Sequence, residues 1–288
     1  MRPFPGTSAS PLQTDPVSEF HDLAELALNR AGQSWGNLGY WKNASDYSDA
    51  CRALATLLGE QAALDHHSIV FDAGFGCGDQ LLLWLEHFGV SQISGVNLSR
   101  SQTAHARTLL AGKGQADASA AIRRGDVNDP AIWKIALDGT KPSHVLALDC
   151  AYHFPDRLAF WGLAGRHLAP AGRLVLTDFM LDPRHRTKGF RHRLLCWMLK
   201  RAHIAETNIV NEEIYRDQLV QAGYGEIIIL DISEYVMPAF SAGSDRKLTW
   251  PVRCKYAVTS RFLKWAYRRS ILRYCLVSAT KVSGSDRH

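Results

Sequence analysis

A short segment with regularly spaced glycines and a preceding aspartate could form a ligand-binding loop. Residues 70–79 read VFDAGFGCGD, so an apolar run leads through Asp72 into glycines at every second position. Glycine tolerates backbone conformations that other residues avoid, and it lets a ligand approach the main chain. The pattern predicts a strand over 68–72 and a helix over 80–88. We therefore expect a ligand site at this turn, formed by Asp72, Gly74, Gly76 and Gly78.

The spacing in this loop argues against two familiar kinds of nucleotide site. A dinucleotide-binding loop has the spacing G-x-G-x-x-G and a carboxylate at the end of the second strand. Here the glycines follow G-x-G-x-G, Asp79 stands where the third dinucleotide glycine would be, and the second strand leads into Asn97. Both departures count against a nicotinamide cofactor, and the absence of G-K-[ST] excludes a P-loop.

Helix and strand patterns alternate along the rest of the chain. Helical spacing of apolar residues predicts helices over 19–30, 47–58, 80–88, 99–110, 158–168 and 211–222. We expect Gly59 to end the second of these and Ser99 to cap the start of the fourth. Extended apolar runs predict strands over 68–72, 92–96, 121–124, 144–148, 172–177, 226–230 and 273–279. This alternation indicates a parallel sheet built from right-handed β–α–β units.

An apolar strand followed by D-x-G-x-G-x-G is the signature of the class I S-adenosylmethionine-dependent methyltransferases, and the chain resembles this family. The similarity extends from about residue 35 to 280 and includes the branch of tocopherol, sugar O- and sterol C-methyltransferases and cyclopropane synthases. It implies an α/β fold: a Rossmann-like, seven-stranded, mostly parallel sheet with helices on both faces and helical cap insertions. It also implies S-adenosyl-L-methionine as the cofactor, with Asp72 near its ammonium end, and no metal ion.

Four further segments carry the resemblance: 37–41 (NLGYW), 95–102 (GVNLSRSQ), 125–127 (GDV) and 148–156 (LDCAYHFPD). The resemblance implies that Asn97 and Gln102 hold the ribose hydroxyls and that Leu98 packs on the adenine. It also implies that Tyr40 reaches over the methionyl end and that Asp126 accepts from the adenine amine; the alternative for Asp126 is a turn residue after a strand. The residues that the resemblance assigns to the cofactor are Tyr40, Asp72, Gly74, Gly76, Gly78, Asn97, Leu98, Gln102, Asp126, Val127 and Asp149.

Methyl transfer from a sulfonium is an in-line displacement, in which the protein mainly aligns the nucleophile, the methyl group and the sulfur. A general base is needed only when the nucleophile arrives protonated, and the candidate is His153, because imidazole titrates near neutral pH. His153 can instead be structural, capping a helix or bonding a backbone carbonyl. The residues that we expect in the reaction site are His153, Asp149 and Tyr152.

The net charge of +5 is unevenly distributed along the chain. Residues 184–201 contain seven Lys or Arg and residues 246–281 contain ten, and neither segment contains an acidic residue. They overlap two insertions, 181–208 and 233–270, that we expect to cap the acceptor site. Basic and apolar residues interleave there at helical spacing. Two interpretations stay open: a solvated face over a core stripe, or a lid that touches an anionic membrane surface or an acidic, lipid-like acceptor.

The composition and the cysteines bound the organisation of the chain. The six cysteines are scattered and form no C-x-x-C pair, and we recognise neither a signal peptide nor an apolar membrane span. These features favour a cytoplasmic protein. If the basic segments bind lipid, we expect the protein to lie at the periphery of a membrane. We expect a disordered tail over 1–18 and a single methyltransferase domain over 19–288, with N-terminal helices at 19–60, a cofactor core at 68–180 and cap insertions at 181–208 and 233–270.

The sequence therefore predicts an S-adenosylmethionine-dependent methyltransferase for O-, N- or C-methylation of a small, hydrophobic or lipid-like acceptor. The alternative is a nucleic-acid or protein methyltransferase that uses the basic segments as a clamp. Nucleic acid is the weaker option, because no RNA-binding module is recognisable. A third hypothesis, a member that has lost catalysis or its cofactor, is disfavoured by the intact glycine loop. The acceptor atom and the oligomeric state stay open.

Overall fold

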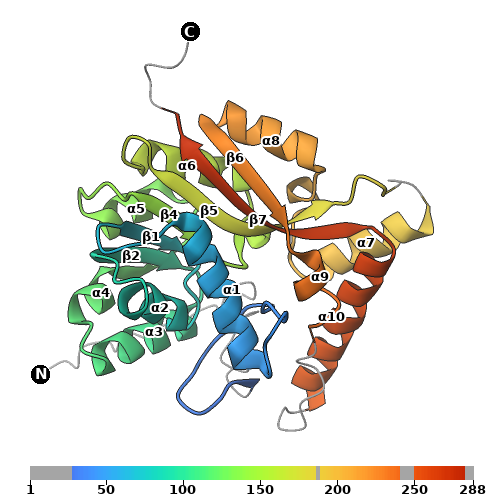
Figure 1. The fold of residues 1–288 in the computed structure, drawn as a ribbon, viewed down its shortest axis with the longest axis horizontal. Coiled ribbons are helices and arrows are strands. Elements are labelled where there is room, and N and C mark those ends of the chain that lie inside the picture. Colours follow the sequence, from blue (N-terminus) through green and yellow to red (C-terminus); the bar gives the residue numbers. More distant parts are fainter. Residues whose placement is uncertain (1–27, 186–188, 241–249, 283–288) are drawn as a thin grey trace, which may run out of the picture.

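One seven-stranded sheet with helices on both faces forms the centre of the molecule (Figure 1). The structure is a computed structural model, and it describes residues 28–185, 189–240 and 250–282. The tail expected over 1–18, and most of the helix expected over 19–30, lie outside these residues.

The strand order is β3-β2-β1-β4-β5-β7-β6. The first five strands along the chain pair in parallel, whereas β7 runs antiparallel to both of its neighbours, β5 and β6. The prediction of a mostly parallel, seven-stranded sheet is confirmed. The strands are β1 (Ile69–Ala73), β2 (Gln92–Asn97), β3 (Ile122–Arg124), β4 (His144–Ala147), β5 (Arg173–Leu181), β6 (Tyr224–Asp231) and β7 (Leu272–Lys281).

Helices bury the two faces of the sheet in two apolar clusters. The helices are α1 (Tyr47–Ala62), α2 (Asp79–Glu86), α3 (Arg100–Gly112), α4 (Ala116–Ala121), α5 (Pro130–Leu137), α6 (Arg157–His167), α7 (Phe190–Arg201), α8 (Glu212–Gln221), α9 (Ser233–Val236) and α10 (Trp250–Arg268). One cluster includes side chains of α1, α2, α3 and α10, and the other includes side chains of α5, α6 and α8. Neighbouring residues of β5, such as Val175 and Leu176, belong to opposite clusters, as strand geometry requires.

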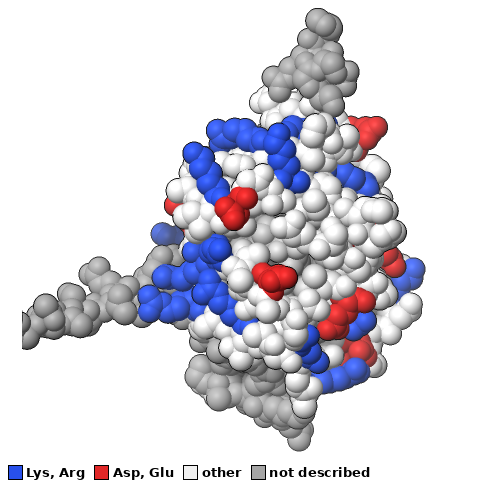
Figure 2. Space-filling view, turned by 90° about the vertical axis from the view of Figure 1, so that its left-hand side faces the viewer, with Lys and Arg blue, Asp and Glu red and all other residues white. Residues whose placement is uncertain are grey.

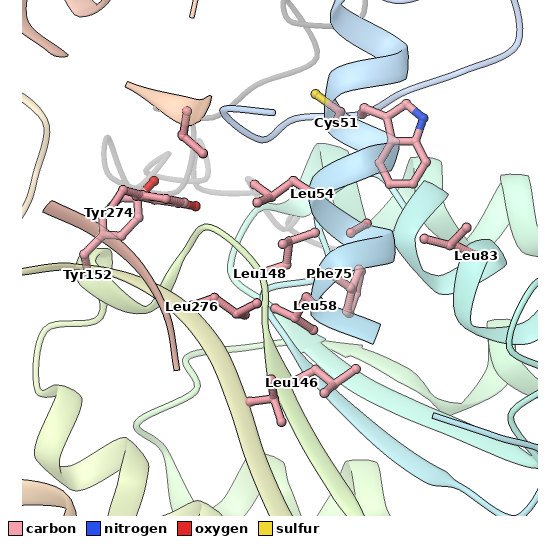
Figure 3. Close-up of a cluster of buried hydrophobic side chains, with 14 of the residues drawn as sticks. Cys51, Leu54, Leu58, Phe75, Leu83, Leu146, Leu148, Tyr152, Tyr274 and Leu276 are labelled. Atoms are coloured by element: carbon pink, nitrogen blue, oxygen red, sulfur yellow. The ribbon is translucent and has the colours of Figure 1, made fainter. Parts of the chain in front are cut away.

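Helix α1 packs on the sheet beside the glycine loop and is longer than the sequence suggests. Figure 3 shows Leu54 and Leu58 of α1 close to Phe75 of the loop. The prediction that Gly59 ends this helix is wrong, because the helix continues to Ala62 and is closed by Ala63 in the left-handed conformation. Gly59 instead allows close packing, since a Cβ there would stand 2.5 Å from the Phe88 ring.

The two insertions that the sequence identifies carry the additional helices. The first, between β5 and α8, contains α7, and the second, between β6 and β7, contains α9 and α10. These helices lie at one end of the sheet, on the right in Figure 1. The short helix α4 and the helix α5, which begins at Pro130, were not expected from the sequence.

A buried ion pair fixes the loop that follows β4. Arg157 at the start of α6 and Asp178 on β5 are almost fully buried, and their charged atoms are 2.9 Å apart. The Tyr215 hydroxyl also donates to Asp178, over 2.9 Å. Arg157 donates to the backbone carbonyl of Asn208, whose amide group donates in turn to the Phe154 carbonyl. This chain of contacts holds the loop over 152–154 in place.

Positive charge is not confined to the two insertions. Figure 2 shows the face that lies on the left in Figure 1, over α3, α4 and α5, where Lys and Arg side chains gather beside several acidic ones. Residues 100–138, which include these helices, contain six Lys or Arg and four Asp. The rest of the molecule is therefore mixed in charge on this side, rather than uniformly acidic.

Candidate active site

A cavity of about 310 Å³ lies at the carboxyl ends of β1, β2 and β4. Open α/β sheets bind their ligands at this edge, and small-molecule sites have volumes of roughly 300–1,000 Å³. The segments that line one half of the cavity are 34–38, 74–80, 96–99, 125–127 and 148–150. This half therefore brings together four of the segments in which the resemblance to methyltransferases was found.

The three glycines of the loop after β1 are favoured at their positions for different structural reasons. All three have positive φ angles: +85° at Gly74, +59° at Gly76 and +104° at Gly78. A Cβ on Gly74 would stand 2.6 Å from the Cys150 sulfur, and a Cβ on Gly78 would stand 3.0 Å from Ala106. A Cβ on Gly76 would meet no protein atom within 4 Å. Gly74 and Gly78 are thus needed for packing, whereas Gly76 borders open space.

Asp72 belongs to the buried surroundings of the cavity. It does not line the cavity; it is fully buried beneath it and accepts hydrogen bonds from Gln80 Nε2 (2.9 Å to each oxygen) and Trp84 Nε1 (2.7 Å). Burial raises the pKa of Asp72 to about 6, against the opposing effect of these two donors. That Asp72 lies near the ammonium end of a cofactor stays a prediction; in this structure Asp72 orients Gln80, which does line the cavity.

The residues expected at the ribose and adenine all line the same cavity. Asn97 and Gln102 are buried, and the Asn97 amide group donates to Gln102 Oε1 over 3.1 Å. Leu98 is 39% exposed and lines the wall beside them. Asp126 and Val127 lie on the loop after β3, where one Asp126 oxygen accepts the Asn128 backbone N–H over 2.9 Å. Asp126 is thus both a turn residue and a cavity residue.

Tyr40 does not line the cavity. Its ring packs edge-on against Tyr235 of α9 with centroids 5.3 Å apart, and its backbone N–H donates to Ala50. That Tyr40 reaches over a methionyl group stays a prediction; in this structure its ring packs against Tyr235, far along the chain, and does not line the cavity. The preceding segment 34–38 covers the cavity instead.

Asp79 anchors that N-terminal segment and was not identified as a site residue from the sequence. It begins α2, lines the cavity, and accepts both the backbone N–H (2.9 Å) and the hydroxyl of Ser34. Burial raises the pKa of the Asp79 carboxyl, and the Ser34 donors oppose this shift. The only sequence signal was its place directly after the last glycine of the loop.

Asp149 is the second anchor and the most connected carboxylate of the cavity. It has a φ of +56°, and its Oδ2 accepts the Leu38 N–H over 2.7 Å. Its Oδ1 accepts the hydroxyls of Tyr152 (2.8 Å) and Tyr274, and Figure 3 shows these two rings side by side. Burial and the Asp149 charge raise the pKa of both tyrosines well above the usual value. Tyr152 therefore stays protonated and acts as a donor rather than a base.

His153 lines the cavity next to Tyr152. Its Nδ1 lies 3.5 Å from the backbone carbonyl oxygen of His203, which belongs to the first insertion and also lines the cavity. His203 itself has a φ of +52°. His153 thus has the contact with a backbone carbonyl that we expect of a structural histidine. Its imidazole also lies at the cavity wall, as we expect of a general base.

The second half of the cavity is apolar and comes largely from the insertions. Its aromatic and aliphatic side chains are Tyr152, Phe154, Phe179, Leu199, Ile204, Phe240, Tyr256, Phe262, Leu263 and Leu272. The amphipathic pattern of the insertions predicted buried apolar faces, and the structure directs several of these residues to the cavity. Phe240 and Ile204 carried no such signal, because they lie between the helices.

Among the described residues, no group of three or more His, Cys, Asp or Glu side chains could hold a metal ion. In the same part of the chain, no helix is both long and apolar enough to cross a bilayer.

Comparison with known proteins gives a consistent set of relatives, although no family model matches the chain. It is 30% identical over 211 residues to erythromycin 3''-O-methyltransferase of Saccharopolyspora erythraea, covering 70% of this chain and 65% of that enzyme. It is 26% identical over 224 residues to 27-O-demethylrifamycin SV methyltransferase of Amycolatopsis mediterranei, covering 74% and 76% of the two chains. The chain thus spans slightly less than two thirds of the length of the erythromycin enzyme.

Solved structures show the same fold at low sequence identity. A sarcosine dimethylglycine methyltransferase of Galdieria sulphuraria superposes with a TM-score of 0.72 at 16% identity, over 93% of this chain and 99% of that one. Geranyl diphosphate C-methyltransferase of Streptomyces coelicolor, solved with S-adenosyl-L-homocysteine, gives 0.68 at 16% identity, over 94% and 100%.

The sheet order, the glycine loop and these superpositions together define a class I methyltransferase fold. The chain thus has the fold of these methyltransferases, and the curated relatives that it resembles carry the names of small-molecule methyltransferases.

The raised pKa of Asp72 makes the free energy of unfolding depend on pH. The unfolded chain ionises this carboxyl near its ordinary pKa of 3.8, whereas the folded protein retains the proton until about pH 6. The protonated Asp72 carboxyl therefore contributes its full share to the free energy of unfolding below about pH 4. This contribution, about 3 kcal/mol, is lost as the pH rises through about 6. Urea unfolding of the wild type and of Asp72→Asn at pH 4 and pH 7 should show a larger decrease for the wild type. Equal pH dependence in the two proteins would contradict this pKa.

Proposed function

We propose that this protein transfers a methyl group from S-adenosyl-L-methionine to a small, hydrophobic acceptor. The observation that carries the proposal is the continuity of one cavity. Its first half is lined by the glycine loop, by the Asn97–Gln102 pair and by Asp126, and its second half is lined by apolar side chains of the insertions. A cofactor in the first half would present its reactive end to an acceptor in the second.

The residues of the first half fit this cofactor in shape and in chemistry. Gly76 borders open space, so a ligand can approach the main chain there. The amides of Asn97 and Gln102 can donate to and accept from ribose hydroxyls, and Asp126 can accept from an exocyclic amine. Asp79 and Asp149 are carboxylates in the wall on the side of the N-terminal segment. These groups suit a cofactor that carries hydroxyls, an aminopurine and positive charge.

The chain's own residues would align the acceptor and remove its proton. When bound, S-adenosylmethionine supplies a methyl group on a sulfonium that leaves as a neutral thioether. Nδ1 of His153 faces the His203 carbonyl, so a proton on Nδ1 leaves the lone pair on Nε2. We assign His153 Nε2 as the acceptor of the proton from a hydroxyl nucleophile. The apolar walls exclude water, which would otherwise compete for the reactive methyl group.

Asp149 and Tyr152 would position the site rather than react. Both oxygens of Asp149 accept hydrogen bonds from the protein, and one of the donors is Leu38 of the covering segment. The Tyr152 hydroxyl donates to Asp149 and its high pKa keeps the proton in place. Their role is thus to close the segment over 34–38 onto the cavity.

The alternative of a nucleic-acid or protein methyltransferase gains no support. Among the described residues that line the cavity, none is Lys or Arg. Nucleic-acid sites depend on such residues to neutralise phosphates. The curated relatives also carry the names of small-molecule enzymes.

A substitution in the glycine loop tests cofactor binding. Gly76→Asp should abolish binding of S-adenosylhomocysteine, measured by calorimetry, because a carboxylate side chain would fill the open space at the loop. Gly89→Asp is the matched control, since Gly89 is exposed, also has a positive φ (+68°), and lies away from the cavity. Unchanged affinity in Gly76→Asp, or the same loss in both variants, would refute the site.

Replacing the proposed base separates turnover from binding. His153→Gln should lower kcat by roughly 10²–10⁴-fold and leave the affinity for S-adenosylhomocysteine within a factor of about two, because His153 lies outside the segments assigned to the cofactor. The assay uses labelled S-adenosylmethionine and an acceptor found by screening phenols, amines, fatty acids and lipid extracts. An unaltered kcat would return His153 to a structural role.

We also propose that the outer face of α7 contacts an anionic membrane surface. Four basic residues of this helix are exposed, namely Arg191, Arg193, Lys200 and Arg201. Two large apolar side chains are exposed among them: Phe190 (77%) and Trp197 (54%). The Arg201 guanidinium lies over the Trp197 ring at 5.7 Å. Aromatic rings among basic residues are typical of surfaces that lie in the bilayer interface.

Cosedimentation with vesicles tests this contact. The wild type should bind vesicles of equal parts phosphatidylcholine and phosphatidylglycerol but not pure phosphatidylcholine, and Trp197→Ser should weaken the binding several-fold. Ile135→Ser is the control, because Ile135 is equally exposed (56%) but lies on α5. No binding to the anionic vesicles, or no effect of Trp197→Ser, would contradict the proposal.

A further inference from the structure

The charge of the cavity wall limits the acceptors that the site can take. The charged side chains in the described part of the wall are all acidic, namely Asp79, Asp126 and Asp149. The polar groups in the acceptor half are the two imidazoles of His153 and His203 and the hydroxyls of Tyr152, Tyr256 and Thr259. Nothing in this part of the wall is a permanent cation, so no Lys or Arg there could form an ion pair with a bound carboxylate or phosphate.

The basic residues that the structure describes in the two insertions add no positive charge to the cavity wall, because they lie outside it. On α7, Arg191 and Lys200 are exposed, while Leu199 lines the cavity. On α10, Arg261 and Arg268 are exposed, while Leu263 is 3% exposed and lines the cavity. Each helix therefore turns apolar residues to the cavity, and the basic residues that the structure describes on it do not line the acceptor site.

An anionic acceptor would lose its hydration in this site without compensation. A buried charge is tolerated in proteins when it is paired or strongly hydrogen-bonded. The Asp149 carboxylate would in addition repel an anion in a medium of low dielectric constant. An uncharged hydroxyl group, by contrast, needs only one acceptor such as His153.

We propose that the acceptor is an uncharged alcohol or phenol with an apolar body, and that the cavity excludes carboxylates and phosphates. This inference rests on the proposed methyl transfer and narrows its substrate class. It also removes the acidic acceptor as an explanation of the basic insertions.

Matched naphthalene probes test the charge preference directly. The protein, saturated with S-adenosylhomocysteine, is titrated by calorimetry with 2-naphthylmethanol and 2-naphthoate, which share one ring system. The alcohol should bind at least tenfold more tightly than the carboxylate. The proposal is overturned if 2-naphthoate binds as tightly as the alcohol, or if the alcohol does not bind. Loss of S-adenosylhomocysteine binding itself would instead refute the proposed function.

A cation placed in the wall should reverse the exclusion of anions. Thr259→Lys introduces an ammonium group at a cavity residue of α10 and should raise the affinity for 2-naphthoate at least tenfold. Val258→Lys is the matched control, because Val258 is 41% exposed, is adjacent on the same helix, and does not line the cavity. Ala202→Lys, at a second wall position, serves if Thr259→Lys does not fold. Unchanged naphthoate affinity in the folded wall variant, or an equal gain in Val258→Lys, would contradict the inference.

Discussion

The hydrogen bonds of Asp149 hold the site together more than any other interaction. This residue follows β4 in a left-handed conformation, and its backbone N–H donates to the Thr177 hydroxyl on β5. Its carboxylate then joins the covering segment through Leu38, the loop after β4 through Tyr152, and β7 through Tyr274. Parts of the chain more than a hundred residues apart are thus fixed at one point. Because these donors converge on one carboxylate, Leu38, Tyr152 and Tyr274 are held together at the cavity.

The distribution of charge separates the site from its surroundings. The described cavity wall contains carboxylates and neutral groups, while the basic residues of α7 lie on its exposed face. The same helix contributes Leu199 to the cavity. One amphipathic helix can therefore serve two environments, an apolar acceptor inside and a charged surface outside. The net charge of +5 describes the exterior of the protein and not its site.

The fold was predictable from the sequence because hydrophobic periodicity and the glycine loop are local signals. Asn97 and Gln102, which are hydrogen-bonded to each other, were also identified from a local motif. Positions that depend on distant partners were not predictable. Asp72 is withdrawn from the cavity by donors on α2, and Tyr40 is held by Tyr235, which lies in the second insertion. Helix α4 was missed because six residues give too short a pattern. Local sequence motifs thus predicted where the cavity lies, whereas contacts between residues far apart in the sequence determine which side chains line it.

The most direct measurement is a transfer assay with S-adenosylmethionine labelled in its methyl group. The purified protein is incubated with neutral alcohols and phenols, with amines, with fatty acids, and with total RNA and protein as macromolecular acceptors. The account predicts label in an uncharged hydroxyl compound and none in fatty acids or macromolecules. Transfer to RNA or protein, or the absence of transfer to every alcohol and phenol tested while S-adenosylhomocysteine still binds, would contradict it.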